Sequence, residues 1–102
     1  LLMYRGVNIN LEEYPYLSLD YAIKGNDANL DVFLGVDYNG DGNIDGYLTP
    51  ESLKEIDLFK MSKDKWENTD YFKYGFKLRK IIFILSEKEG YLNLKLRGFK
   101  IY

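Results

Sequence analysis

The sequence predicts an all-β protein, an antiparallel sandwich or barrel, on three observations. Apolar and polar residues alternate through most of the chain, for example at Val7, Ile9 and Leu11. The alternating runs recur about every ten residues, as in sandwiches and barrels. Clusters of Gly, Asn and Asp separate them and are typical of turns. Because alternation gives a strand one apolar and one polar face, each run is expected to be half-buried.

The individual elements follow from the same pattern. Strands are expected over 1–4, 7–11, 17–23, 30–36, 45–49, 56–61, 80–85 and 91–102, with turns at 24–27, 39–42 and 87–90. Residues 81–85 are apolar on both faces, which predicts a strand in the middle of a sheet. A helical turn is expected after Thr49, which can cap it, and Pro50, which suits the first helical position. Residues 62–75 are polar with isolated aromatics and predict a long loop or weak strand.

Composition limits the classes of function. The chain has 102 residues, 14 Lys+Arg against 16 Asp+Glu, and neither Cys nor His. We expect a single domain over 1–102. The near balance of charge argues against nucleic-acid binding, and no apolar run is long enough for membrane insertion. Without Cys or His, disulfide frameworks, thiol nucleophiles and His-based triads are excluded, and we expect no enzymatic activity.

Two further expectations concern the origin of the chain. Strand-like sequence at both ends favours an excised or processed domain, a fragment of a longer protein. Lysine (11) outnumbers arginine (3) and glutamine is absent, a composition that leans toward a thermophile.

The segment 37–45, Asp-Tyr-Asn-Gly-Asp-Gly-Asn-Ile-Asp, is the most informative part of the chain. Oxygen-bearing residues recur at every second position, and a hard cation needs such ligands. The predicted metal ligands are Asp37, Asn39, Asp41, Asn43 through its backbone carbonyl, and Asp45. Gly42 permits the sharp turn between them. Three carboxylates this close repel one another, and a divalent cation removes that repulsion. The alternative is a plain hairpin, because Asn-Gly and Asp-Gly pairs form turns without an ion.

This segment resembles the calcium loop of EF-hands and dockerins up to Asp45. At the twelfth position, where the EF-hand supplies a bidentate Glu, this chain has Leu48, and the flanks alternate like strands. The resemblance therefore implies a structural calcium in a turn between two strands. Water or a residue from elsewhere, with Glu51 the nearest candidate, replaces the missing carboxylate.

Over most of its length the chain resembles non-catalytic jelly-roll modules of the carbohydrate-binding type. The similarity rests on 11–21 with its Tyr-Pro-Tyr-Leu, on 31–36 leading into the acidic loop, and on 81–85 followed by 91–102 with its terminal Phe-Lys-Ile-Tyr. Membership implies an antiparallel two-sheet jelly-roll-like sandwich with a structural calcium, attached to an extracytoplasmic enzyme. It often implies a sugar-binding face, although some such modules serve only as support domains, including on membrane glycosyltransferases.

Sugar binding requires exposed aromatic rings beside polar groups. Trp66 lies in a polar setting and is the first candidate, and Tyr38, Tyr71 and Tyr74 are the others. The alternative for Trp66 is a core plug at one end of the sandwich. Tyr14, Tyr16 and Tyr21 are expected to pack in the core.

The other clusters of charged residues are not expected to form functional sites. The basic residues Lys73, Lys77, Arg79 and Lys80 are expected to form a solvated strand face. Paired carboxylates such as Glu12-Glu13 can in principle support glycoside hydrolysis, but nothing in the sequence places a pair in a cleft.

The sequence thus predicts a non-catalytic, extracytoplasmic accessory module with a calcium site that binds a polysaccharide or oligosaccharide. The alternative is a purely structural support domain of a larger cell-surface or membrane enzyme, without a ligand of its own. In either case its partners include neighbouring domains of the parent chain.

Overall fold

The computed structural model describes residues 2–24, 29–67, 71–86 and 93–102. In chain order the elements are β1 (Leu2–Asn10), β2 (Tyr16–Lys24), β3 (Asn29–Asp37), β4 (Gly46–Leu48), β5 (Ile56–Asp57), α1 (Leu58–Lys65), α2 (Tyr71–Tyr74), β6 (Lys77–Ser86) and β7 (Asn93–Ile101). The turns expected over 24–27 and 87–90 fall, apart from Lys24, outside the described residues.

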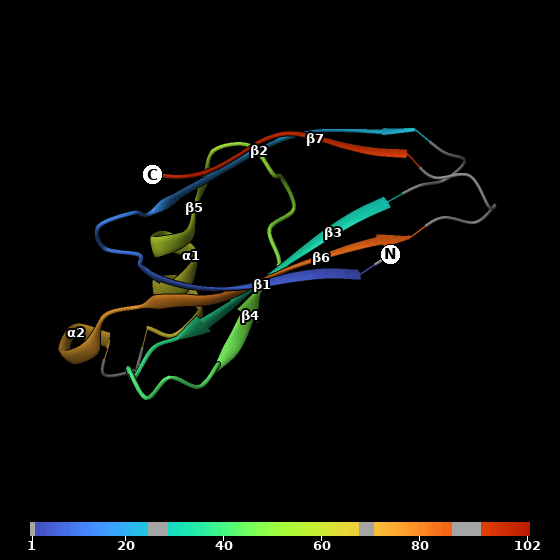
Figure 1. Cartoon of the computed structure of the whole chain (residues 1–102). Helices are drawn as coiled ribbons and strands as arrows, with labels where there is room; N and C mark the ends of the chain where they lie inside the picture. Colours follow the sequence, from blue (N-terminus) through green and yellow to red (C-terminus); the bar gives the residue numbers. More distant parts are fainter. Residues whose placement is uncertain (1, 25–28, 68–70, 87–92) are drawn as a thin grey trace.

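The strands form two antiparallel sheets (Figure 1). One sheet has four strands in the order β1-β6-β3-β4, and the other has three in the order β5-β2-β7. Among the described strands, taken in chain order, only β3 and β4 are consecutive strands of the same sheet, and the chain changes sheet at each of the other five connections between strands. The expected all-β, antiparallel two-sheet sandwich is confirmed.

The core lies between the sheets because each contributes its apolar alternate positions. In β3 the buried residues are Leu30, Val32, Leu34 and Val36. Leu17 and Leu19 of β2 face them from the other sheet and belong to the same buried cluster. The strand β6 pairs with β1 on one side and with β3 on the other. The apolar run 81–85 therefore occupies the middle of its sheet, as expected.

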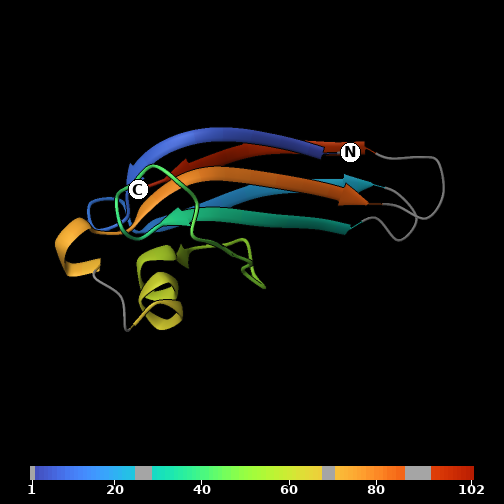
Figure 2. The same ribbon diagram turned by 90° about the horizontal axis from the view of Figure 1, so that it is seen from below.

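Both helices and the β3–β4 connection gather at one end of the elongated molecule (Figure 2). A β-bulge between Gly35 and Val36 shifts the pairing of β3 with β6 just before this end, and a bulge re-aims the residues that follow it. Asp37, the last residue of β3, is fully buried there. This geometry places the acidic segment against the core.

The helical turn expected after Thr49 is absent from the structure. The backbone carbonyl of Leu53 instead accepts a hydrogen bond from the N–H of Leu19 in β2 at 2.9 Å. The backbone of this segment is therefore hydrogen-bonded to the sheet rather than within a helix. Glu55 has φ of +50°, a left-handed conformation that does not continue a right-handed helix.

The strand expected over 56–61 was also wrong beyond its first two residues, because α1 begins at Leu58. The Asp57 carboxylate caps this helix by accepting from the backbone N–H of Lys60 at 2.9 Å. Leu58 and Ser62 lie one turn apart and are buried, and Met61 packs beside them against the core. The buried residues of this segment are therefore spaced as on one face of a helix, not at every second position as in a strand. Most of the described part of 62–75, expected as a loop or weak strand, is also helical.

Neither helix in the described residues has the length and apolar character of a membrane span.

Candidate metal site and its aromatic surroundings

The segment 37–45 reverses the chain between β3 and β4, which pair antiparallel from Val36↔Gly46 onward. Gly40 and Gly42 have φ of +73° and +88°, values that residues with a Cβ rarely adopt. The Asp45 N–H donates to the carbonyl of Val36 at 2.8 Å and closes the loop at its base. The turn predicted over 39–42 is therefore present.

The Asp37 carboxylate organises the loop. Its Oδ1 accepts from the backbone N–H groups of Asn39 at 3.2 Å and Gly40 at 2.8 Å. Its Oδ2 accepts from the N–H of Gly42 at 2.9 Å. Because a buried carboxylate is costly unless it is hydrogen-bonded, these three donors account for the fully buried position of Asp37.

Arg79 of β6 is the second partner of Asp37. Its Nε donates to Oδ2 at 3.2 Å, and its Nη2 lies 3.2 Å from the same oxygen. Its Nη1 donates to the side chain of Asn8 on β1 at 3.0 Å, which ties three strands together. The expectation that Arg79 belongs to a solvated strand face was wrong: it forms an ion pair with a buried acid 42 residues away. No local pattern reveals this contact, because it depends on the register of β3 with β6.

These contacts set the charge state of Asp37. Burial alone raises the pKa of a carboxyl. Here the hydrogen bonds from Gly42 and Gly40 and the charge of Arg79 outweigh burial and hold the pKa of Asp37 below its ordinary value. Asp37 is therefore ionised throughout the neutral range.

Three of the five predicted metal ligands bring carboxylates together. One oxygen each of Asp37, Asp41 and Asp45 lies within 4.8 Å of the others, close enough to hold a metal ion. Among the described residues, Arg79 is the one cation that forms an ion pair with these three carboxylates, which leaves two negative charges without an ion-pair partner there. A divalent cation neutralises that excess.

The two asparagines stand in the same loop. The side-chain oxygen of Asn39 accepts from the N–H of Asp41 at 3.2 Å. The N–H of Asn43 donates to Asp41 Oδ1 at 2.8 Å, and the N–H of Tyr38 donates to Asp45 Oδ2 at 2.9 Å. Glu51, proposed as an additional carboxylate, is not in the acidic group and lines a separate cavity.

The aromatic residues predicted to bind sugar lie around this loop. The ring of Trp66, which ends α1, lies 6.1 Å from that of Tyr38 and 6.2 Å from that of Phe76, between centroids. A Cβ on Gly46 would come within 2.9 Å of Trp66 Cζ2, so the indole packs directly on the backbone of β4. Trp66 is half-buried and belongs to the rim of the core.

Tyr74 at the end of α2 packs against the loop from outside. A Cβ on Gly40 would lie 3.4 Å from the Cβ of Tyr74, and Tyr74 remains exposed. Tyr71 is in the same helix, and its side chain lies outside the described part of the structure. The structure thus brings Tyr38, Trp66 and Tyr74 together, but as neighbours of the acidic segment.

The tyrosines expected to pack in the core are exposed. Tyr14, Tyr16 and Tyr21 have exposed fractions of 51%, 42% and 36%. Leu17 and Leu19 take the inward positions of β2, so Tyr16 falls outside and lies 5.7 Å from Tyr102 between ring centroids.

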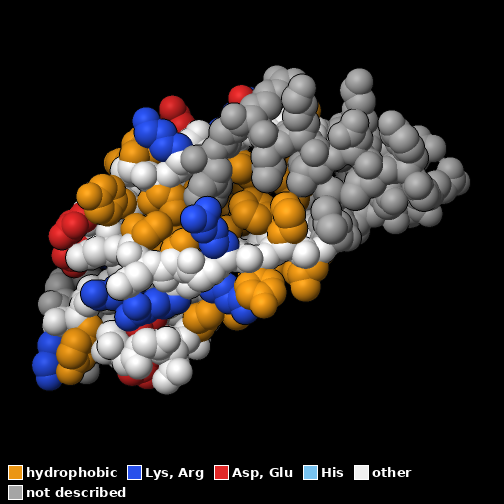
Figure 3. All heavy atoms as spheres, viewed as in Figure 1, with side chains coloured by type: hydrophobic (Ala, Val, Ile, Leu, Met, Phe, Trp, Pro, Cys, Tyr) orange, Lys and Arg blue, Asp and Glu red, His pale blue; other side chains and the backbone are white. Residues whose placement is uncertain are grey.

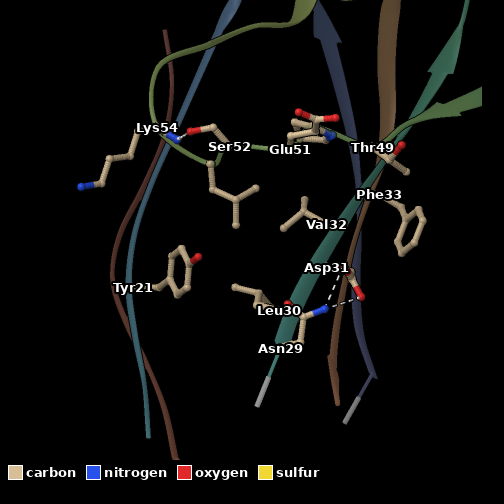
Figure 4. A pocket seen from close by; sticks show the side chains of 12 residues that line it. Tyr21, Asn29, Leu30, Asp31, Val32, Phe33, Thr49, Glu51, Ser52 and Lys54 are labelled. Atoms are coloured by element: carbon tan, nitrogen blue, oxygen red, sulfur yellow. Dashed lines mark hydrogen bonds between the residues drawn. The ribbon is translucent and has the colours of Figure 1, made fainter. Parts of the chain in front are cut away.

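A cavity of about 730 Å³ opens between β2, β3 and the segment 49–54. Figure 4 shows Tyr21 projecting toward Leu30 and Val32 across it, with Ser52 and Glu51 above. Figure 3 shows hydrophobic side chains gathered near the middle of the face of the molecule that is seen in Figure 1. Glu51, the candidate for the missing calcium carboxylate, lines this cavity, whereas the five residues predicted as metal ligands and the four predicted to bind sugar are not among its lining residues.

Comparison with protein-family models, with curated proteins and with solved structures finds no match for the chain.

Proposed function

We propose that this chain is a non-catalytic structural module whose Asp37–Asp45 loop binds calcium. The observation that carries the proposal is the convergence of Asp37, Asp41 and Asp45 within 4.8 Å, with two negative charges left after Arg79 is counted. Oxygen ligands in a flexible loop suit calcium better than magnesium, which requires near-ideal octahedral geometry. Bound calcium fixes the β3–β4 turn to the adjoining sheet edge.

The arrangement of the aromatic residues supports a structural role for the same corner. The Trp66 ring contacts those of Tyr38 and Phe76, and the indole lies on Gly46. Rings engaged in this way brace the loop against the core. We therefore place the support-domain interpretation before carbohydrate binding.

Isothermal titration with calcium, followed by magnesium, tests the metal proposal. We expect one calcium per chain and much weaker binding of magnesium. The variant Asp45→Asn should lose most of the affinity, whereas the exposed Asp64→Asn on α1 serves as the matched control. Absence of heat with calcium at millimolar concentration would overturn the proposal.

Carbohydrate binding through Trp66, Tyr38, Tyr71 and Tyr74 stays a prediction. Affinity electrophoresis against a panel of polysaccharides tests it, with Tyr74→Ala as the informative variant because this ring is exposed. Retardation that Tyr74→Ala abolishes would support sugar binding, and migration unchanged on every glycan would support the purely structural role.

A further inference from the structure

The outer face of the four-stranded sheet carries an apolar surface that the core does not use. Because Leu30, Val32 and Leu34 of β3 are buried, Asp31 and Phe33 lie on the opposite face. Figure 4 shows Phe33 and Asp31 projecting from β3 away from Leu30 and Val32. A depression of about 490 Å³ on this face is lined by Phe33, Tyr47, Thr49, Lys65, Ile82 and Ile84.

The register of the sheet arranges this face in three cross-strand rows. The central row is apolar and contains Tyr4 of β1, Ile82 of β6 and Phe33 of β3. Tyr4 is 68% exposed, and Ile82 and Phe33 are half-buried. A mid-sheet strand such as β6 is typically apolar on both faces when both are covered, yet its outer side is open in the described structure.

The two flanking rows carry opposite charges. On one side lie Leu2, Ile84 and Asp31, and on the other lie Gly6, Lys80 and Gly35. Ile44 and Tyr47 cover the position of Gly35. The Lys65 ammonium donates to the carbonyl of Tyr47, which adds positive charge at the Lys80 end. Each flanking row is two residues, about 7 Å, from the centre along the strands.

This pattern is self-complementary under a two-fold rotation. A dyad along the central row, in the plane of the interface, exchanges the two flanking rows between copies. In the single chain the Lys80 ammonium lies 4.6 Å from the centroid of the Tyr4 ring. In the dimer it leaves that ring and turns toward the Asp31 row of the other copy, which is displaced sideways by one strand spacing of about 4.8 Å, a distance that a lysine side chain reaches. The central residues Tyr4, Ile82 and Phe33 meet their own counterparts.

We propose that the outer face of the four-stranded sheet is a homodimer interface, in which a second copy of this chain packs across a dyad through Ile82. The face spans roughly 20 Å in each direction, about 400 Å² per copy, below the roughly 800 Å² of a standard interface. An interface of this size is typical of weak, transient association. This interface does not use the carboxylates of the proposed calcium site, although Ile44 of the same loop borders the face at Gly35.

Analytical ultracentrifugation from about 10 µM to 1 mM tests the proposal at the concentrations such an interface requires. The wild type is expected to pass from monomer to dimer across this range. Ile82→Lys places two cations on the dyad and should leave a monomer, with a cooperative thermal transition confirming that it folds.

Exchanging the charges of Asp31 and Lys80 distinguishes this specific interface from non-specific association. Asp31→Lys and Lys80→Asp should each weaken the dimer at least tenfold, because each pair occurs twice. The double variant should recover wild-type association, and Asp20→Lys on the other sheet is the matched control. A chain that stays monomeric at 1 mM, or single variants that dimerise like wild type, would overturn the proposal.

Discussion

Two regions at the same end of the sandwich are held in different ways. In the Asp37 loop, residues 37–45, backbone N–H groups and the Arg79 guanidinium converge on one buried carboxylate. At the Trp66 junction, formed by Trp66, Tyr38, Phe76 and Gly46, ring contacts and close packing hold β4 and α1 together. We therefore expect the loop to respond to pH and to the calcium proposed to bind there, and the junction to respond only to changes in side-chain shape.

The largest expected effect is at the junction. Trp66→Ala should lower the free energy of unfolding by about 3 kcal/mol, at the low end for an aromatic deletion because the ring is half-buried. Urea unfolding at pH 7 and pH 5 measures it, and the loss should be equal at both. Trp66→Phe, which keeps a ring, should lose less. A loss below about 0.5 kcal/mol would mean that the indole is not part of the core rim.

The next effect is at the loop. Asp37→Asn should lower the free energy of unfolding by about 2 kcal/mol at pH 7, because Arg79 and backbone donors lose their charged acceptor. Thermal unfolding over a pH series measures the gap in stability between the variant and the wild type. This gap should narrow as the pH falls, because Asp37 of the wild type then becomes protonated. Asp64→Asn, an exposed control on α1, should show no gap. A gap independent of pH would show that the charge of Asp37 does not matter.

Gly46→Ala sharpens the comparison because it tests shape alone. The added Cβ would lie 2.9 Å from Trp66 Cζ2, and overpacking of this kind costs about 1–2 kcal/mol. In a Trp66→Leu background the same substitution should cost much less. A double-mutant cycle measures this coupling. Additive effects would contradict the direct contact.

The smallest effect is the response of the wild type to acid. Because the pKa of Asp37 is lowered in the folded state, its contribution is fully present above the ordinary pKa of 3.8 and is lost as pH falls through the folded value. Protonation leaves the side chain in place, so the loss should be smaller than for Asp37→Asn. Unfolding curves between pH 6 and pH 2 measure it, and equal acid sensitivity of wild type and Asp37→Asn would contradict the assignment.

Much of the fold follows from local pattern. Alternation at Leu17 and Leu19, and at Leu30 to Val36, predicts strands that the structure contains because one face of each is buried. The apolar run 81–85 predicts a central strand for the same reason. The helix α1 is different: Ile56 and Leu58 alternate like a strand, but Asp57 caps the next turn. Leu58 and Ser62, one helical turn apart, are both buried, and the Ser62 hydroxyl donates to the carbonyl of Leu58 within the helix.

The candidate site also has features that the local sequence predicts and features that depend on distant segments. The Gly and Asp spacing of 37–45 predicts a tight acidic turn, because those residues form it through their own backbone. The roles of Arg79, Asn8 and Gly46 depend on strand register and packing between distant segments, which a single sequence does not contain. The polar surroundings of Trp66 in the sequence single it out, but its contact with Gly46 depends on how the end of α1 packs on β4.

The most direct test of the central claim is thermal unfolding of the wild type with calcium and with a chelator, beside the Asp41→Asn/Asp45→Asn variant. These two carboxylates are exposed, so their removal leaves the buried core unchanged. A hundredfold excess over the dissociation constant stabilises the folded state by about 2.7 kcal/mol, which corresponds to a rise in Tm on the order of 10 °C. We predict that rise in the wild type and none in the variant, and a wild-type Tm that is the same with calcium and with chelator would contradict a calcium-binding loop.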